Sequence, residues 1–461
     1  MSFQNKEKRI NIKEASIEIE GLSDNKKYQD IKYLDNILGC IYGNCLGDAY
    51  GLSTEFLNKE KICELYPDPN VFIDFPNYIT NRHNRRWDKG DWTDDTDQMI
   101  LILQTLIECN GEIDIKLFSN KLKNWVENGF EELGDQSGMG LGQTVGSVVF
   151  NENFQDEPTM VSKFVWINGG KKMAANGSLM RTSILGCMDF LDDAKVFQNT
   201  LECCKVTHYD SRCIVSCLLF TKIISDILKY NNNNNNQDDE KLKIIIDQII
   251  NNLTNNQKYN QIANLLFQSN QMISKEEKIE NFKLFNQYVN FNEWSELDLD
   301  EGSSIGYVYK CLGSAILSLR KFNQYYFQNN NDSKEKSFVF RKVLDELIRE
   351  GGDSDTNGST AGSLLGSIIG YSNLPKDMLL ALPNKSWLDQ QVLKFIDIVI
   401  DRINSNKINS FTFNNLKDQL PLSYINETDD NPYINFNLKN KNKKMESNIN
   451  VENKNSNCSV Q

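Results

Sequence analysis

The 461-residue chain lacks the long apolar runs and the ordered cysteine spacing that would place it in a membrane or outside the cell. No run approaches the roughly 20 apolar residues that a membrane-spanning helix needs. The first twenty residues, MSFQNKEKRINIKEASIEIE, do not contain the apolar core of a secretory signal peptide. Eleven cysteines occur without regular spacing. We therefore expect a cytoplasmic protein with reduced thiols.

The chain also lacks an excess of positive charge and lacks glycine motifs that bind phosphate. Its formal net charge is -13, which argues against non-specific nucleic-acid binding through the whole surface, so we expect no nucleic-acid partner. Gly138, Gly140 and Gly142 do not complete a G-x-G-x-x-G motif, because Gln143 and Val145 stand where a third glycine is needed. No P-loop is present in the sequence.

Composition divides the chain into three parts. Residues 1–28 are polar and are expected to form a flexible N-terminal segment, and residues 29–403 are expected to form one large domain. An asparagine tract at 231–236 opens an Asn-rich insertion that runs to about residue 290. Its KLKIIIDQII stretch could form helices, but a solvated low-complexity insertion is the favoured interpretation. Residues 404–461 are Asn- and Lys-rich and are expected to be a mostly disordered tail.

The apolar residues of the domain recur mostly at helical spacing. One stripe follows Thr93, and a second precedes residue 350, with apolar positions at Met99, Ile100, Leu103, Leu106 and Ile107, and at Val339, Val343, Leu344, Leu347 and Ile348. Strand-like alternation bounded by turns is scarce. The pattern predicts an all-α fold.

Glycine recurs every fourth residue in two segments. These are LDNILGCIYGNCLGDAYGL, with Gly39, Gly43, Gly47 and Gly51, and TNGSTAGSLLGSIIGY, with Gly358, Gly362, Gly366 and Gly370. Each glycine costs a helix about 1 kcal/mol relative to alanine, so four on one face need a compensating cause. Close contact between helix backbones supplies one. We predict two tightly packed central helices, each beginning beside an acidic cluster, with glycine-rich loops as the alternative.

Two acidic motifs stand out, each at the start of an apolar run. The first acidic motif is WTDDTDQM (residues 92–99) and the second acidic motif is GGDSDTNGST (residues 351–360). Thr93 is a good N-cap, and capping explains one or two acids but not the whole first cluster. Crowded carboxylates and hydroxyls are hard oxygen ligands, suited to Mg²⁺, Mn²⁺ or Ca²⁺ and not to zinc. The motifs are therefore predicted to converge on one ion or a pair.

The second acidic motif partly matches two known motifs but lacks a required residue of each. Asp353, Asp355 and Asn357 match the opening of an EF-hand loop, but its twelfth position would be Leu364, where glutamate is required. A phosphatase of the aspartyl-phosphate type needs a preceding strand and a threonine where Asn357 stands, whereas the preceding run here is helical.

Four segments in order resemble the ADP-ribosylglycohydrolase family. They are IYGNCLGDAYGLSTEF, WTDDTDQM, ANGSLMRTSILG and GGDSDTNGSTAGSLLG, and the resemblance covers roughly residues 32–400. It implies an all-α orthogonal helical bundle with a binuclear Mg²⁺ centre, or Mn²⁺ in its place, at the bottom of a cleft.

The resemblance also implies roles for individual residues. The metal ligands would be Thr93, Asp94, Asp95, Asp353, Asp355 and Thr356. Glu55, Asp94 and Asp355 would be the catalytic residues, with Glu55 matching the family's acidic residue near the metals. The segment that lines the ADP-ribose would supply Gly177, Ser178, Met180 and Arg181, and His208 matches a histidine that often follows that segment.

The function implied by the resemblance is metal-dependent cleavage of an ADP-ribosyl glycosidic bond. ADP-ribose would be released from a modified protein side chain or a small acceptor, so an ADP-ribosylated protein or an ADP-ribose derivative is the expected partner. Arginine, serine and O-acetyl-ADP-ribose remain open as acceptors. The alternatives are a catalytically silent ADP-ribose binder or structural relative, and a hydrolase of another N- or O-glycoside.

Both histidines invite a second interpretation. His208 lies among four cysteines, but the spacing fits no standard zinc pattern and favours ordinary buried thiols. His83 lies in the basic segment NRHNRRWDKGDW and is predicted to be a surface residue. Arg82, Arg85 and Arg86 of that segment are predicted to form a solvated loop, with contact to an anionic substrate or target protein as the alternative.

The last four residues, CSVQ, fit a C-a-a-X prenylation pattern of the farnesyl type at Cys458, although Ser459 is not aliphatic. Lysines upstream would give a second, electrostatic membrane signal. Membrane attachment through a prenylated Cys458 is one interpretation, and the alternative is that the cysteine occurs in the tail by chance.

Overall fold

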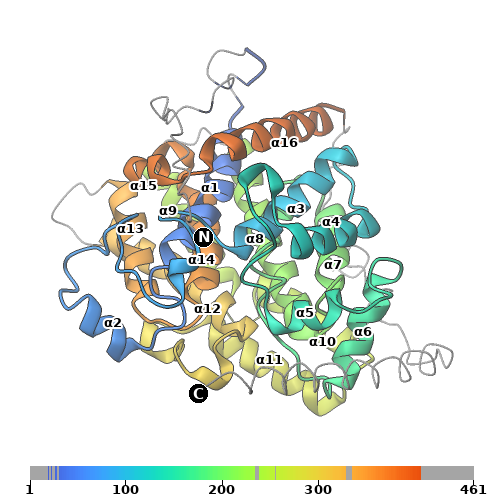
Figure 1. Ribbon diagram of the computed structural model, residues 1–461. Helices are drawn as coiled ribbons and strands as arrows, with labels where there is room; N and C mark the ends of the chain where they lie inside the picture. Colours follow the sequence, from blue (N-terminus) through green and yellow to red (C-terminus); the bar gives the residue numbers. More distant parts are fainter. Residues whose placement is uncertain are drawn as a thin grey trace, which may run out of the picture.

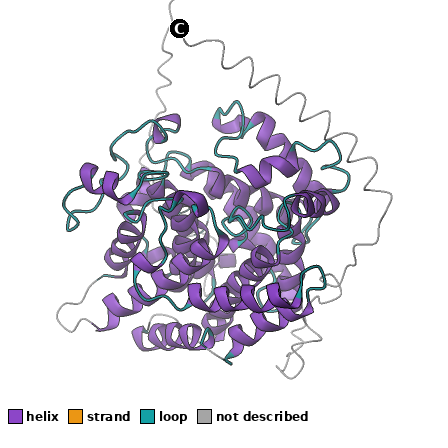
Figure 2. Ribbon diagram, turned by 90° about the horizontal axis from the view of Figure 1, so that it is seen from below, coloured by secondary structure: helices purple, strands orange, loops and turns teal. Residues whose placement is uncertain are grey.

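The computed structural model describes residues 19, 22, 26–28, 31–233, 238–254, 256–328 and 335–405. In this part of the chain sixteen α-helices and several short 3₁₀ turns form a helical bundle (Figure 1). No β-strand occurs within these ranges, where Ala175 and Tyr307 form an isolated antiparallel bridge (Figure 2). The predicted all-α fold is confirmed.

Two antiparallel helices, α1 (Leu34–Gly51) and α14 (Ser354–Ile369), form the centre of the bundle (Figure 1). A Cβ placed on Gly43 would lie 2.2 Å from the carbonyl oxygen of Gly362, and one placed on Gly362 would lie 2.1 Å from that of Gly43. Gly39 and Gly47 meet Gly366 and Gly358 in the same way. The two glycine stripes therefore face each other, and the predicted close packing of two helices is confirmed.

The prediction that both central helices begin beside an acidic cluster is wrong for α1. Helix α14 begins at Ser354, inside the second acidic motif, but α1 begins at Leu34 and brings its last turns to the acids. The first acidic motif instead begins α3 (Asp94–Glu108). The antiparallel pairing of α1 and α14 explains the difference, because it sets the end of one helix beside the start of the other.

Further helices enclose this pair. α12 and α13 pack on α14, while α3, α8 and the 3₁₀ turn at Ser183–Gly186 contact the pair from other sides. The bounds of these and the remaining helices are α2 Lys59–Leu65, α4 Ile115–Asn128, α5 Gln143–Val149, α6 Pro158–Asn168, α7 Asp193–Lys205, α8 Ser211–Asn233, α12 Val308–Asn323, α13 Lys336–Ile348, α15 Lys376–Ala381 and α16 Lys385–Ser405.

The Asn-rich insertion is folded where the structure describes it, so the expectation of a solvated insertion is wrong there. It contains α9 (Asp239–Asn252), α10 (Lys258–Ser269) and α11 (Lys275–Val289). Ile246 and Ile249 of α9 are buried in the main core. Asp226 of α8 accepts a hydrogen bond from Tyr259 of α10 at 2.9 Å. The apolar residues at helical spacing therefore determine the structure of this segment, and its many polar residues lie on the exposed faces of the helices.

The ends of the chain are described only in part. Ile19 is buried against the core, and the Tyr28 hydroxyl donates to Asp397 at 2.9 Å, so part of the segment expected to be flexible is packed. Helix α16 continues to Ser405, and Cys458 lies outside the described residues, where prenylation stays a prediction. Among the described helices, none is long and apolar enough to cross a membrane.

Candidate functional site

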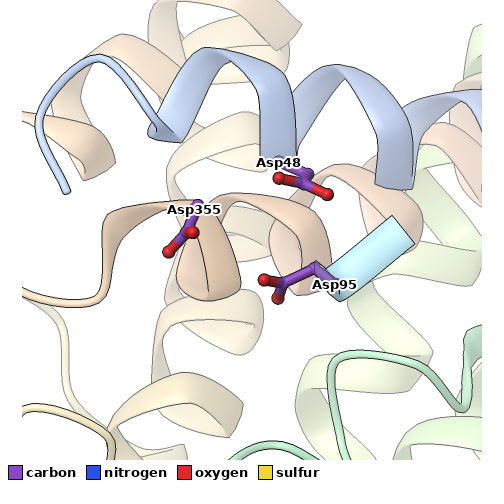
Figure 3. Close-up of side chains that lie close together, drawn as sticks. All are labelled: Asp48, Asp95 and Asp355. Carbon is purple, nitrogen blue, oxygen red and sulfur yellow. The ribbon is translucent and has the colours of Figure 1, made fainter. Parts of the chain in front are cut away.

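The two acidic motifs meet at one place, 260 residues apart in sequence. Asp95 lies in the first turn of α3, Asp355 lies in the first turn of α14, and Asp48 lies in the last turn of α1. Figure 3 shows these three side chains lying close together. The positive ends of the α3 and α14 dipoles favour carboxylates at these first turns.

Thr93 stands at the N-cap of α3 as predicted, but its side chain makes no capping hydrogen bond. Its hydroxyl instead lies 2.9 Å from an oxygen of Asp48 and 3.2 Å from oxygens of both Asp95 and Asp355. A hydroxyl has one proton, so it can donate to only one of these three carboxylate oxygens. Its other two contacts bring oxygen acceptors together without a proton from the hydroxyl between them. Thr93 therefore belongs to the acidic centre and not to the helix cap.

Asp48 is a member of this centre that the sequence analysis did not single out. It accepts hydrogen bonds from the backbone N–H groups of Thr93 and Thr96, both at 3.0 Å, and from the Thr96 hydroxyl at 2.6 Å. Burial raises the pKa of Asp48 to about 7. The available signal was an acid one residue after Gly47, in a helix whose residues are mostly apolar or glycine.

The carboxylates form two overlapping groups with ligand atoms within 4.8 Å of one another. Asp48, Asp95 and Asp355 make one group, and Glu55, Asp353 and Asp355 make the other. Asp355 is common to both. These are the groups of potential metal-ligating side chains that the described residues form, and both consist of carboxylates alone.

The hydrogen bonds to the centre come from neutral groups. The Ser359 hydroxyl donates to Asp95 at 3.1 Å, the Asn176 amide donates to Asp353 at 2.8 Å, and Thr356 N–H donates to Asp355 at 2.8 Å. Burial, followed by the neighbouring carboxylates, raises the pKa of Asp95 and Asp355 well above the ordinary range. Neutral donors leave this charge uncompensated, which is a reason for the centre to hold protons or a cation.

Asp97 of the first acidic motif and Asp91, which precedes the motif by one residue, take no part in the acidic centre. The indole N–H groups of Trp92 and Trp125 donate to the two oxygens of Asp97, at 2.8 and 3.0 Å. The Asn384 amide donates to Asp91 at 3.1 Å. Asp91 and Asp97 therefore serve the packing around α3 and not the acidic centre.

A cavity of about 610 Å³ opens above the acidic centre. Glu55, Asp94, Asp95, Asp353, Asp355 and Thr356 line it, and these include most of the implied metal ligands. Three further segments also line the cavity, namely residues 140 and 142–145, 172–177 and 302–307. Gly177, Met180 and His208 also line it. Of the predicted site residues, Thr93, Ser178 and Arg181 do not reach the lining.

Arg181 and Ser178 lie behind the cavity wall. The fully buried guanidinium of Arg181 donates to Gln98 at 2.9 Å and to the Thr207 hydroxyl at 2.8 Å. Gln98 in turn donates to Asp94 at 2.9 Å. Ser178 is buried and accepts a hydrogen bond from the Cys217 thiol. Arg181 therefore supports, through Gln98 and Thr207, two residues that line the cavity, Asp94 and His208, whereas Ser178 packs against a thiol outside the lining.

His208 presents an uncharged ring to the cavity wall. Its Nδ1 lies 2.7 Å from the Thr207 hydroxyl, which also accepts a hydrogen bond from Arg181. A hydroxyl can accept two hydrogen bonds or donate one, so either ring nitrogen of His208 can carry the proton. Nε2 is buried and has no hydrogen-bond partner among the described residues. Burial and the charge of Arg181 lower the pKa of His208 to about 3.

His83 is not the surface residue that the sequence analysis predicted. Its side chain is 18% exposed, and Nε2 lies 2.6 Å from a carboxylate oxygen of Glu55. Arg86 donates to Nδ1 at 2.8 Å. Because a guanidinium can only donate, Nδ1 is the acceptor and Nε2–H points to Glu55. The basic segment therefore holds the Glu55 carboxylate, which lines the cavity beside Asp353 and Asp355.

The cysteines around His208 are free and buried, as predicted. Cys213 donates to the carbonyl oxygen of Ala175, and Cys204 donates to that of His208. These are the contacts of packed thiols and not of a zinc site.

Comparison with known proteins gives this arrangement a family. A sequence model of the ADP-ribosylglycohydrolase family matches residues 29–407. ADP-ribosylarginine hydrolase Tri1 of Serratia proteamaculans is 23% identical over 359 residues, which is 78% of this chain and 76% of that protein. ADP-ribosyl-[dinitrogen reductase] glycohydrolase of Rhodospirillum rubrum is 19% identical over 366 residues, or 79% of this chain and 96% of that protein.

A solved structure described as an ADP-ribosylglycohydrolase-related protein complex aligns with a TM-score of 0.46 and 17% identity, over 80% of this chain and 99% of that one. The family match extends over most of the chain and includes all four segments that carry the resemblance. This chain belongs to the ADP-ribosylglycohydrolase family.

Proposed function

We propose that the protein is a metal-dependent hydrolase that cleaves an ADP-ribosyl glycosidic bond and releases ADP-ribose from a modified protein side chain or a small acceptor. The observation that carries this proposal is the convergence of both acidic motifs on the floor of one cavity. The names of two relatives, an ADP-ribosylarginine hydrolase and an ADP-ribosyl-[dinitrogen reductase] glycohydrolase, make ADP-ribosylarginine the first acceptor to test.

The donor set fits Mg²⁺ or Mn²⁺. The ligands would come from Thr93, Asp94, Asp95, Asp353, Asp355 and Thr356, with Asp48 beside them. All these groups offer oxygen, which hard divalent cations prefer. The two clusters of three carboxylates, which have Asp355 in common, support a pair of ions. A bound pair would offset the carboxylate charge, orient the ribose hydroxyls and stabilise charge as the glycosidic bond breaks.

The cavity walls offer the ADP-ribose polar contacts that do not depend on the metal. His208 presents Nε2, which has no partner among the described residues, as a hydrogen-bonding group. A Cβ on Gly177 would lie 3.3 Å from both His208 and Val145, so glycine keeps this part of the wall open to the ligand. Asp94, held by Gln98, faces the same cavity from the floor.

Glu55 is placed to act on the bond that breaks. Hydrolysis joins a water oxygen to the anomeric carbon, breaks its bond to the acceptor atom, and transfers a proton from the water to the leaving acceptor. Glu55 lines the cavity, and His83 fixes its carboxylate by a 2.6 Å hydrogen bond. It can take the water proton as a general base or deliver one to the acceptor as a general acid.

A catalytically silent ADP-ribose binder is the main competing function. Such a protein would have no use for a cavity-lining carboxylate that His83 and, through it, Arg86 hold in place, which favours the enzyme. A hydrolase of another glycoside would keep the same acidic centre and would differ in its ligand.

One experiment separates these functions. ADP-ribose binding is measured by calorimetry with Mg²⁺ and with chelator, on wild type and Asp355→Asn, and ADP-ribose release is measured from an ADP-ribosylarginine peptide. We expect metal-dependent binding that the substitution abolishes, together with release. Binding without release from arginine, serine or O-acetyl-ADP-ribose substrates would indicate the silent binder. Binding that ignores both metal and Asp355 would refute the metal centre, and no binding would indicate another glycoside.

A further inference from the structure

A second hollow, of about 490 Å³, adjoins the cavity at Glu55. It is lined by Glu55, Phe56, Leu57, Asn81, Arg82, His83, Arg85 and Arg86. Glu55 and Phe56 line both spaces. Phe56 is 54% exposed and adopts a positive φ of 58°, which a bulky side chain rarely does, and its N–H is held by the Gly352 carbonyl at 2.7 Å. The boundary between the two spaces is thus a fixed carboxylate and a fixed exposed ring.

The basic segment that forms the other wall is held in place by its own asparagines. The Asn81 side chain accepts hydrogen bonds from the N–H groups of His83 and Asn84, at 2.7 and 2.9 Å. The Asn84 side chain accepts from Asn81 N–H at 2.8 Å and donates to the Ile79 carbonyl at 3.1 Å, and Asn84 is buried. The segment is therefore a pre-organised wall, and its three arginines are exposed, as predicted for a solvated loop.

The three arginines of this wall differ in their partners. Arg86 donates to His83 and lies 4.6 Å from the Trp87 ring centroid. Arg82 and Arg85 are exposed and have no hydrogen-bond or ion-pair partner among the described residues. Two unpaired guanidinium groups face a hollow in a chain with a formal net charge of -13. A guanidinium fork matches a carboxylate in geometry and charge.

We propose that this hollow is the acceptor subsite and that Arg82 and Arg85 bind carboxylate side chains next to the modified residue of an ADP-ribosylated protein. The inference rests on the proposed function, because the acceptor must lie across Glu55 from the ADP-ribose for that carboxylate to act on the bond between them. It adds a substrate preference: acidic sequence around the modification site increases affinity through the arginines, and Phe56 contacts the acceptor chain.

Two ADP-ribosylarginine peptides test the preference, one with glutamates and one with serines flanking the modified residue. Their binding is measured on the full chain in a Glu55→Gln background, in which loss of the carboxylate slows turnover. The test protein is Arg82→Gln/Arg85→Gln. The matched control is Lys116→Gln/Lys394→Gln, which removes two exposed positive charges that line neither space. Free ADP-ribose, which carries a pyrophosphate but no acceptor, is the third ligand.

We expect the arginine changes to weaken binding of the glutamate peptide by about three- to tenfold, as for one or two partly exposed ion pairs. Binding of the serine peptide and of ADP-ribose should stay within about twofold, and the lysine control should resemble the parent. Equal affinity of the parent for both peptides, or an equal loss in the lysine control, would overturn the proposal. A matching loss for free ADP-ribose would assign the arginines to the pyrophosphate instead.

Failure of the hydrolase proposal has a different signature. Release of ADP-ribose is measured in parallel with Glu55 intact. Absence of release from both peptides would refute the hydrolase, while the binding ratio of the two peptides would still decide whether Arg82 and Arg85 recognise acidic sequence.

Discussion

His83 and Glu55 come from separate loops, and their side chains meet at 2.6 Å between Nε2 and a carboxylate oxygen. The ring also contacts Phe56, at 4.7 Å between centroids, and Trp87, at 5.2 Å. His83 is thus packed between aromatic rings and carries an N–H that can only be directed at Glu55 while Arg86 occupies Nδ1. This fixes the one acid of the site that lines both the cavity and the neighbouring hollow.

The first prediction distinguishes the role of the His83 N–H group from that of the aromatic ring. His83→Phe keeps the aromatic packing but removes the hydrogen bond to a charged group, worth roughly 1.5–3 kcal/mol. We expect kcat for ADP-ribose release to fall at least about tenfold with KM nearly unchanged, whereas His83→Gln, which keeps an N–H donor, should stay within about threefold. Steady-state kinetics measure both, and thermal unfolding verifies that the variants fold. A larger loss in His83→Gln than in His83→Phe would show that the ring and not its proton matters.

The second prediction concerns the crowded charge at Asp355. Burial and the neighbouring Glu55, Asp95 and Asp353 raise its pKa, so Asp355→Asn should raise the melting temperature in chelator by relieving repulsion. In millimolar Mg²⁺ the wild type should gain about 2–3 kcal/mol, as expected for an ion at about 100 times its Kd, and the variant should gain much less.

Asp91→Asn is the control for that experiment, because Asp91 lies outside the acidic centre and is bonded to Asn384. It should keep the Mg²⁺-induced increase in melting temperature. The metal centre would be disproved if Mg²⁺ stabilised Asp355→Asn as much as the wild type.

The third prediction tests the contact between the two central helices. A Cβ on Gly362 would lie 2.1 Å from the Gly43 carbonyl oxygen, so Gly362→Ala must push two buried backbones apart. We expect a loss of at least about 3 kcal/mol in unfolding free energy. Gly146→Ala in α5 is the comparison, since its Cβ would meet its nearest neighbour at 3.5 Å.

Gly146→Ala should be neutral or stabilising by up to about 1 kcal/mol from helix propensity. Urea denaturation of both proteins measures the difference. A tolerated Gly362→Ala would mean that the helices have room for a methyl group, which is incompatible with the distances between them.

The fourth prediction concerns pH and His208, whose pKa is lowered to about 3 by burial and by Arg181. Because this lies below the ordinary value, the unfolded chain binds the proton first as the pH falls. The stability that the neutral ring contributes is complete above about pH 6.5 and is lost progressively toward pH 3. Between pH 7 and 5 the loss should be about 2 kcal/mol. His208→Gln should remove that part of the pH dependence, measured by urea denaturation at pH 7, 6 and 5; an unchanged slope would contradict it.

Local patterns predicted the parts of the site that depend on local structure. Glycine every fourth residue marks one face of a helix wherever that helix packs, so the contact between α1 and α14 followed from residues such as Gly43 and Gly362. Acids after an N-cap lie in the first turn of the following helix, which placed Asp95 and Asp355. The prediction for the Asn-rich insertion was wrong because composition was given more weight than the helical spacing of residues such as Ile246 and Ile249.

The sequence by itself determined an all-α chain, its two central helices and the residue types of an oxygen-rich acidic centre, because helix periodicity and capping act over a few residues. Only the tertiary structure decided that Asp48 enters the centre, that His83 holds Glu55 and that Arg181 lies behind the cavity wall. Each of these depends on the antiparallel fit of distant helices and on a few hydrogen bonds between loops. Such contacts leave no periodic trace in the sequence, since each one is made by a single pair of side chains far apart along the chain.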